Sequence, residues 1–212
     1  MLALAGADTG QPRTIALDRG QHFELVRGKT ETTDYRGRHA LKLLPSADAG
    51  PDDDMLAILS DPTFGDGTIE VDVAGAPRAG VPANMRGFIG LAFRIQQEPS
   101  HFELFYIRPT NARMDDQLIR NHTTQYVSSP DYGWPRLRKE SPGVYESYVD
   151  VEAGAWTHLK IVVAGKQARL YVNGATQPCL IVNDLKQGES KGRIGLWAHV
   201  TTDAYFSKLA VR

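Results

Sequence analysis

The chain has 212 residues, enough for one large β domain with a sizeable core. Its 24 basic and 25 acidic residues give a formal net charge of -1, so no global field favours nucleic acid or an anionic membrane. The sequence contains no phosphate-binding glycine loop, Cys/His zinc spacing or G-x-S-x-G motif, which argues against a nucleotide cofactor and thiol chemistry. The single cysteine, Cys179, excludes an intramolecular disulfide and is expected to be a buried, inert thiol.

The first 13 residues, MLALAGADTGQPR, have a small and apolar start without a basic region before it. They are expected to be a flexible tail or the remnant of a signal peptide, and residues 14–212 are expected to form a single domain. The periplasm or the cell exterior is the expected location, with the cytoplasm as the alternative. No run approaches the roughly 20 apolar residues that a membrane-spanning helix needs.

Short runs that alternate apolar and polar residues, divided by Gly, Pro, Asn and Asp, predict β-strands along most of the chain. The expected strands are 14–17, 22–27, 39–44, 55–59, 68–73, 87–95, 102–108, 156–163, 168–172, 180–182, 193–199 and 204–211. The first two are expected to pair around a turn at residues 18–20. No stretch of ten or more residues has a helical period, so the sequence predicts an all-β fold, most simply two packed antiparallel sheets.

The alternation also predicts which side chains face the core. The aliphatic sets expected there are Ile89, Leu91, Phe93 and Ile95; Leu159, Ile161 and Val163; and Ile194, Leu196 and Ala198. The opposite faces carry the small residues Gly90 and Ala92, which make a shallow surface suited to a ligand. Candidate ligand-binding residues on this surface are Arg94, His158, Lys160, Trp197 and His199. An aromatic ring beside Arg and His suits a sugar; ordinary packing is the alternative for the tryptophan.

Residues 111–148 are expected to form a long loop held over one face of the scaffold. Long loops in compact domains are usually functional or disordered, and this one is too aromatic for disorder. Its candidate catalytic residues are His122, Asp131 and Glu146, because imidazole and carboxyl groups transfer protons. Its candidate ligand-binding residues are Tyr126, Trp134, Arg136 and Arg138. The alternatives are a tryptophan that pins the loop and an ion-pair network among the arginines and glutamates.

Two Asp-rich loops near the start of the predicted sandwich offer oxygen ligands for a metal ion. The candidate ligands are Asp52, Asp54 and Asp66, and calcium is the expected ion because it prefers carboxylate and carbonyl oxygens. The spacing does not match an EF-hand loop, and solvated turns are the alternative.

The second half of the chain carries a recognisable set of strand motifs. W-x-H-L-K-I-V-V-A-G-K-x-A-R-L-Y-V-N-G, then P-x-L-I-V-N-D, G-R-I-G-L-W-A-H and Y-F-S-K-L-A-V, resemble the concanavalin A-like lectin/glucanase superfamily. F-G-D-G-T-I-E-V-D-V and G-F-I-G-L-A-F-R extend the resemblance, which covers roughly residues 67 to 211. Within the superfamily, the chain looks like the laminin-G-like branch and the bacterial domain of unknown function linked to 3-keto-disaccharide hydrolysis.

This resemblance implies a jelly roll of two curved antiparallel sheets that binds carbohydrate on the concave sheet, and some members also bind calcium. The E-x-D-x-x-E motif of the retaining glucanases is incomplete here, since Glu70 and Asp72 are followed by Gly75. The expected function is a glycan-processing protein that binds a saccharide or modified sugar on the concave sheet, with glycoside hydrolysis and lysis as candidate reactions. The alternatives are a non-catalytic carbohydrate-binding module and a laminin-G-like protein-interaction domain.

Overall fold

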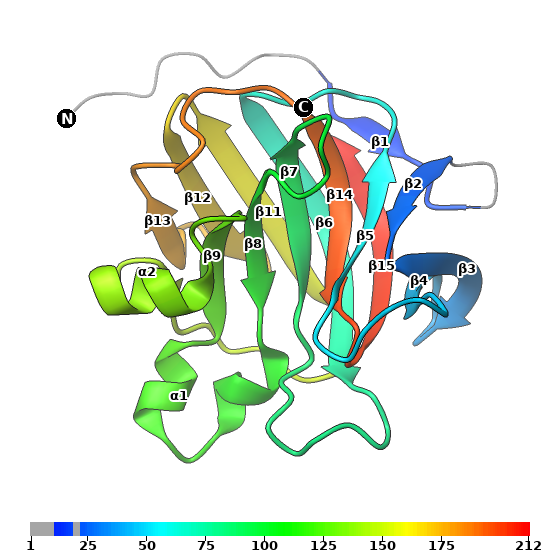
Figure 1. Ribbon diagram of the computed structural model, residues 1–212, viewed down its shortest axis with the longest axis horizontal. Helices are drawn as coiled ribbons and strands as arrows, with labels where there is room; N and C mark the ends of the chain where they lie inside the picture. Colours follow the sequence, from blue (N-terminus) through cyan, green and yellow to red (C-terminus); the bar gives the residue numbers. More distant parts are fainter. Residues whose placement is uncertain (1–10, 19–21) are drawn as a thin grey trace.

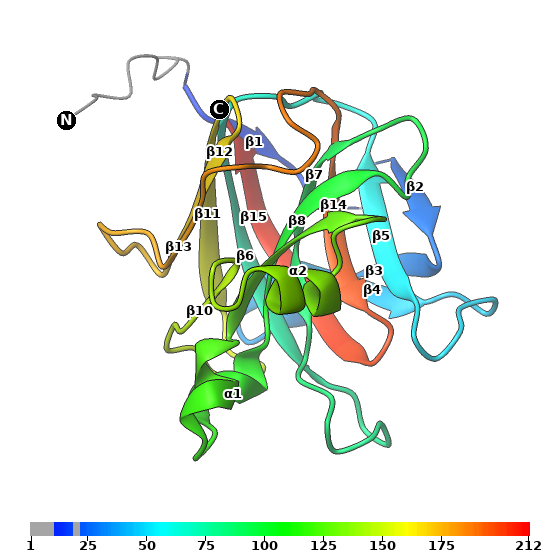
Figure 2. The same cartoon turned by 60° about the vertical axis from the view of Figure 1, so that its left-hand side comes forward.

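The computed structural model describes residues 11–18 and 22–212, which form two antiparallel sheets packed face to face (Figures 1 and 2). The larger sheet, sheet A, has the order β13-β12-β11-β6-β15-β4-β3, with β1 paired to β15. Its strands are β1 (Arg13–Ile15), β3 (Gly28–Tyr35), β4 (Arg38–Pro45), β6 (Gly67–Pro77), β11 (Thr157–Ala164), β12 (Gln167–Val172), β13 (Leu180–Val182) and β15 (Thr202–Val211). The all-β sandwich predicted from the sequence is therefore confirmed.

The second sheet, sheet B, has the order β10-β9-β8-β7-β14-β5-β2. Its strands are β2 (Phe23–Val26), β5 (Asp54–Leu59), β7 (Ile89–Ile95), β8 (Phe102–Ile107), β9 (Thr124–Ser129), β10 (Glu146–Ser147) and β14 (Arg193–His199). Three short helices follow β8 and β9: the 3-10 helix η1 (Pro109–Arg113), α1 (Gln117–Asn121) and α2 (Trp134–Glu140). Among the described residues, no helix is long and apolar enough to cross a bilayer.

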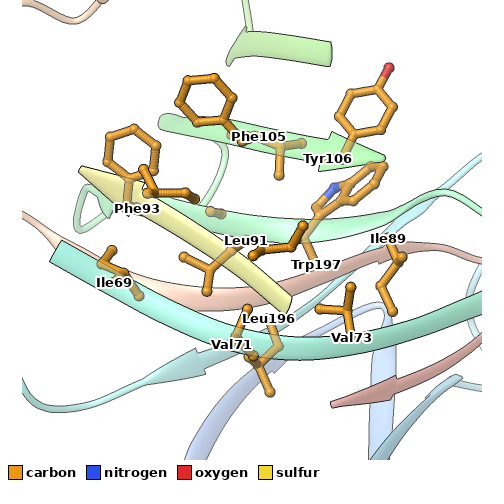
Figure 3. Close-up of a cluster of buried hydrophobic side chains, with 14 of the residues drawn as sticks. Ile69, Val71, Val73, Ile89, Leu91, Phe93, Phe105, Tyr106, Leu196 and Trp197 are labelled. Carbon is orange, nitrogen blue, oxygen red and sulfur yellow. The ribbon is translucent and has the colours of Figure 1, made fainter. Parts of the chain in front are cut away.

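The core lies between the sheets and is built from the alternating aliphatic residues that the sequence predicts. Leu159, Ile161 and Val163 of β11 are buried, as are Leu91 and the other inward residues of β7 and β14. Figure 3 shows this cluster, with side chains of β6 and β7 meeting between the layers. Burying a side chain of this size stabilises the fold by about 1.5–3 kcal/mol, so the shared core holds the two sheets together.

The structure differs from the sequence-based expectation in three respects. The first two predicted strands do not pair with each other, because β1 joins sheet A and β2 joins sheet B. Residues 19–20 of the expected turn, and residues 1–10 of the expected tail, lie outside the described residues. Strand β3, GKTETTDY, was not expected because it lacks an apolar face; it is an edge strand held by its pairing with β4.

The third difference is the segment 111–148, which is not one long loop. It contains β9 in the body of sheet B, β10 at its edge, and the helices α1 and α2, which lie at the β9 end of that sheet (Figures 1 and 2). The alternation of apolar and polar residues does not predict strand β9, because its buried positions include Thr124, Gln125 and Ser128. Hydrogen bonds satisfy these groups, as when Gln125 Nε2 donates to the carbonyls of Tyr126 at 2.8 Å and Tyr145 at 3.1 Å.

A buried arginine joins three connections at the end of the sandwich away from α1. Arg94 is 1% exposed, and its guanidinium donates to the carbonyls of Gly65 (3.1 Å), Gly165 (2.8 Å) and Gly188 (2.5 Å). It also forms an ion pair with Asp66 at 3.0 Å. These bonds hold the β5–β6, β11–β12 and β13–β14 connections to one side chain, so Arg94 has a structural role.

We predict that Arg94→Met lowers the free energy of unfolding by about 3 kcal/mol, because three carbonyls and a carboxylate lose their donor. Urea denaturation measures the change. The control is Arg13→Met, since Arg13 is 60% exposed in its ion pair with Asp61 and its removal costs at most about 1 kcal/mol. Equal losses in the two variants would contradict the structural role of Arg94.

Candidate functional site

The outer face of sheet B is hollow at its centre because β7 carries no large side chain there. Gly90 lies opposite Trp197 of β14 on one side and Tyr106 of β8 on the other. A Cβ at position 90 would lie 2.1 Å from the carbonyl oxygen of Phe105 and 2.6 Å from Tyr106 Cβ, so glycine is required. The rings of Tyr106 and Trp197 meet with their centroids 4.9 Å apart, side by side in Figure 3. They form an aromatic floor that is mostly buried, since each of the two residues is only 4% exposed.

Segments around this floor form the sides of an open cavity of about 780 Å³. The walls come from residues 84–88 before β7, from residues 52–54 at the start of β5, and from α1 and α2. The polar and aromatic residues that line it include Asp54, Arg108, His122, Trp134, Arg138 and His199. The cavity has an apolar floor and polar groups at two ends, which is the usual composition of a small-ligand site.

One end of the cavity is built around Arg108, which directly follows β8 and is 5% exposed. Its guanidinium donates to the carbonyl of His122 at 2.9 Å, to the hydroxyl of Tyr106 at 2.7 Å and to Gln125 Oε1 at 3.2 Å. It also lies over the Tyr106 ring, 4.8 Å from the centroid. Burial raises the pKa of Tyr106 to about 12, so its hydroxyl stays protonated while it accepts the bond from Arg108.

Next to Arg108, a carboxylate is held by a second arginine. Glu146 of β10 accepts two hydrogen bonds from Arg138, one from Nε at 2.8 Å and one from Nη2 at 2.7 Å. His122 Nδ1 also contacts Glu146. Burial lowers the pKa of His122, although the neighbouring Glu146 acts in the opposite direction, so the imidazole is neutral near pH 7. The Arg138 guanidinium lies 4.7 Å from the centroid of the Trp134 ring.

Trp134 supplies an exposed aromatic wall. It is the first residue of α2 and follows Gly133, and Pro135 occupies the next position, where a missing N–H costs the helix nothing. The indole is 46% exposed although it lines the cavity, which is unusual for so large an apolar ring. An exposed ring at the edge of a hollow can cover a bound molecule.

The other end of the cavity is formed by Asp54 and His199, which are opposite each other on β5 and β14. His199 Nδ1 lies 2.7 Å from the Thr201 hydroxyl and accepts from the Thr201 backbone N–H at 3.3 Å, so the ring proton is on Nε2. Asp54 is open to the cavity, yet protein atoms surround its carboxyl. This desolvation raises the pKa of Asp54 to about 6, with the Trp197 indole N–H acting in the opposite direction.

The structure brings many of the predicted site residues together. His122, Trp134, Arg138, Trp197, His199, Asp52 and Asp54 all line the cavity. Glu146 lies directly behind it, in contact with Arg138 and His122. These residues come from five separate segments of the chain, so the sheet topology, and not their spacing in sequence, gathers them.

Other predicted site residues lie elsewhere. His158 and Lys160 are on β11 of sheet A, so the prediction that they share a face with Trp197 is wrong. Arg94 has φ 53°, which breaks the alternation of β7 and turns its side chain to the loops described above.

Tyr126 points into the core, where its hydroxyl donates to Glu103 at 2.6 Å. Asp131 and Arg136 are exposed at the start of α2, where Arg136 donates to the Asp131 carbonyl and pairs with Glu140.

Two residues central to the cavity were not expected from the sequence. Strand β8 is buried on both faces, so its period does not indicate that Tyr106 faces outward. Arg108 was placed at the end of that strand without a role. The signal that could have found Arg108 is a charged residue directly after a strand that is apolar on both faces. Such a strand is central in its sheet, so a charge at its end lies close to buried groups and needs hydrogen-bond partners there.

The carboxylates expected to bind calcium do not gather in one place. Asp52 and Asp54 line the cavity, whereas Asp66 pairs with Arg94 beside a different hollow. Across residues 11–18 and 22–212, no group of three or more His, Cys, Asp or Glu side chains is arranged to hold a metal ion. The residues present do not fit the predicted metal site.

No protein-family model and no curated protein matches this sequence. Solved structures do match. Their likeness to this chain shows that it has a concanavalin A-like sandwich fold. The carbohydrate-binding module CBM66 from Bacillus subtilis is 15% identical, with a TM-score of 0.57 over 89% of this chain and 97% of that one. A protein of unknown function with a galectin-like fold, also from Bacillus subtilis, is 15% identical, with a TM-score of 0.57 over 90% and 88%. The metal-free exoplasmic/lumenal domain of VIP36 is 9% identical, with a TM-score of 0.57 over 89% and 83%.

We predict that Asp54→Asn removes a pH-dependent loss of stability. Because the folded-state pKa of Asp54 is raised to about 6, the folded chain favours the protonated carboxyl. The wild type therefore loses stability relative to the variant as the pH rises from about 4 to about 6. Since the side chain is open to solvent, the difference at pH 7 is on the order of 1 kcal/mol. Urea denaturation at pH 4 and pH 7 measures it; a difference independent of pH would contradict the raised pKa.

Proposed function

We propose that this chain binds a saccharide in the cavity on the outer face of sheet B. The observation that carries the proposal is the aromatic floor of Tyr106 and Trp197 between two polar ends. Sugar rings present apolar C–H groups that stack on aromatic rings, and the 46% exposed Trp134 offers such a ring beside the mostly buried floor, while the sugar hydroxyls require hydrogen-bond partners at the edges. The volume of about 780 Å³ falls in the range typical of small-ligand sites.

The polar ends supply both kinds of partner. Arg108 and Arg138 offer guanidinium donors, and His199 carries its proton on Nε2. Asp54 offers carboxyl oxygens across the floor. Trp134 lines the cavity from α2 and is placed to cover one face of a bound sugar. Structural likeness to a protein named as a carbohydrate-binding module supports the same proposal.

Binding, and not glycoside cleavage, is the function we propose. The two carboxyl groups of a glycosidase lie about 5 to 10 Å apart. Glu146 is on β10 and Asp54 on β5, five strands away in sheet order. At about 4.8 Å per strand this is roughly 24 Å along the sheet. Glu146 is also held by two hydrogen bonds from Arg138, and Asp131 lies outside the cavity lining.

A thermal-shift screen against neutral, amino and acidic mono- and oligosaccharides tests the proposal. A saccharide present at 100 times its dissociation constant stabilises the fold by about 2.7 kcal/mol, a readily measured rise in Tm. Product analysis of each hit after long incubation tests for turnover. If no saccharide raises Tm, the binding proposal fails; if a hit is cleaved, the protein is an enzyme.

We predict that Trp134→Ala weakens binding of a saccharide hit about tenfold without changing Tm, because an exposed ring contributes roughly 1–1.5 kcal/mol through stacking. Calorimetric titration measures the dissociation constant. Tyr171→Ala is the matched control, because Tyr171 also lies beneath a cation, with Lys160 Nζ 5.6 Å from its centroid, but on sheet A. Equal affinity in the two variants would contradict the placement of the saccharide against Trp134.

A further inference from the structure

The inference concerns the class of saccharide and rests on the proposed function. Arg108 is a buried cation whose hydrogen-bond partners among the described residues are all uncharged. Its acceptors are the main-chain carbonyl of His122, the hydroxyl of Tyr106 and the amide oxygen of Gln125. Within the described part of the chain, no carboxylate forms an ion pair with it. A buried charge without a counter-charge is costly, so the fold retains an unfavourable feature at this point.

Arg108 also has donors to spare. A guanidinium carries five N–H groups in a planar fork, and the described residues accept three hydrogen bonds from it. Because Arg108 lines the cavity, its remaining donors are placed for a ligand. Arginine stays protonated even where burial lowers its pKa, as it does here, so the cation persists at neutral pH.

The residues around Arg108 compensate its charge only in part, because the nearby Glu146 is shared with Arg138. The nearby carboxylate, Glu146, is occupied by Arg138 in a two-bond ion pair and by the contact with His122. With the imidazole neutral, two arginines and one glutamate leave one positive charge in excess at this end. Arg86 adds another at the cavity wall, where its guanidinium donates to the carbonyls of Ala83 and Met85 and, among the described residues, pairs with no carboxylate.

The negative charges of the cavity lie at its far end. Asp54 begins β5 and Asp52 lies two residues before it, whereas Arg108 directly follows β8, three strands away in sheet order. The cavity is therefore polarised, with excess positive charge beside Arg108 and carboxyl groups beside His199. A ligand that matches this pattern carries an anionic group at one end and hydroxyls at the other.

We propose that the natural ligand is an anionic saccharide, whose carboxylate or sulfate ester binds Arg108 while its ring lies on Tyr106 and Trp197. Arginine suits both anions, because a guanidinium donates charge-assisted hydrogen bonds to carboxylate and sulfate oxygens, and the Nε hydrogen and one Nη1 hydrogen of Arg108 are not used by the described residues. The hydroxyls at the opposite side of the sugar then lie near Asp54 and His199, which accept and donate hydrogen bonds.

The test uses the full chain and matched saccharides in calorimetric titrations. The probes are galacturonic acid oligosaccharides, their methyl esters, sulfated galactose oligosaccharides and the neutral galactose oligosaccharides. We expect the galacturonic acid oligosaccharides or the sulfated galactose oligosaccharides to bind at least tenfold more tightly than the corresponding methyl esters or neutral oligosaccharides. Comparing the dissociation constants of the two acidic groups of probes then shows whether the site prefers a carboxylate or a sulfate. Raising NaCl from 50 to 500 mM is expected to weaken acidic binding severalfold and leave neutral binding unchanged.

The outcomes separate this inference from the proposed function. If a neutral saccharide or an ester binds as tightly as its acid, the anionic class is wrong while saccharide binding stands. If no acidic, neutral or esterified saccharide binds, both fail. Binding of acids that is insensitive to salt also overturns the inference, since it shows that charge does not drive the preference.

A substitution tests the assignment to Arg108. Arg108→Gln keeps hydrogen-bonding capacity without the charge, and it is expected to reduce the preference for acid over ester from tenfold or more to less than twofold. Arg136→Gln is the matched control, because Arg136 is exposed outside the cavity and pairs with Glu140. A folded Arg108→Gln protein that keeps the full preference overturns the assignment. If that variant does not fold, the salt dependence of the wild type decides.

Discussion

The close approach of β7 to β8 at Gly90 is the constraint on which the functional surface depends. Any Cβ there would meet the carbonyl of Phe105, so β7 has no side chain at this position. The neighbouring strands then place Tyr106 and Trp197 over the gap. An outer sheet face is normally covered by solvent-exposed polar residues; this one instead becomes an aromatic floor, and every wall of the cavity is arranged around it.

Two buried arginines at opposite ends of sheet B show how similar residues take different roles. Arg94 gives its donors to three carbonyls and an aspartate, and these contacts hold loops together. Arg108 gives its donors to neutral groups and faces the cavity. A saturated buried arginine stabilises a fold, whereas an unsaturated one carries an unmatched charge that a ligand can meet. The difference lies in the partners and not in the residue type.

Period-2 alternation was sufficient to predict the sandwich, most strands and the core-facing aliphatic residues, because those features follow from burial on one side of a sheet. It also placed Trp197, His199, Gly90 and Ala92 on one outer face, where they lie. It failed for Arg94, whose positive φ breaks the alternation, and for β9, whose buried polar residues hide the period.

The composition of the site was harder to predict than the fold. Alternation states which face a residue occupies but not which sheet its strand joins, so His158 and Lys160 were grouped with Trp197 although they belong to sheet A. Arg108 was missed because β8 is buried on both faces. The contact between Glu146 and His122 joins residues on separate elements of sheet B, and such long-range pairing leaves no local pattern in the sequence.

The three tryptophans allow the most direct test of the central claim that a saccharide binds over the floor of sheet B. Trp134 and Trp197 line the cavity, whereas Trp156 is associated with sheet A through Tyr35 and Arg38. In the Trp156→Phe variant, the two remaining tryptophans both line the cavity, so selectively excited tryptophan fluorescence reports on the cavity. Titration with a saccharide that binds in calorimetry is predicted to change the emission of this variant with the same dissociation constant. Calorimetric binding that leaves this emission unchanged would contradict the account.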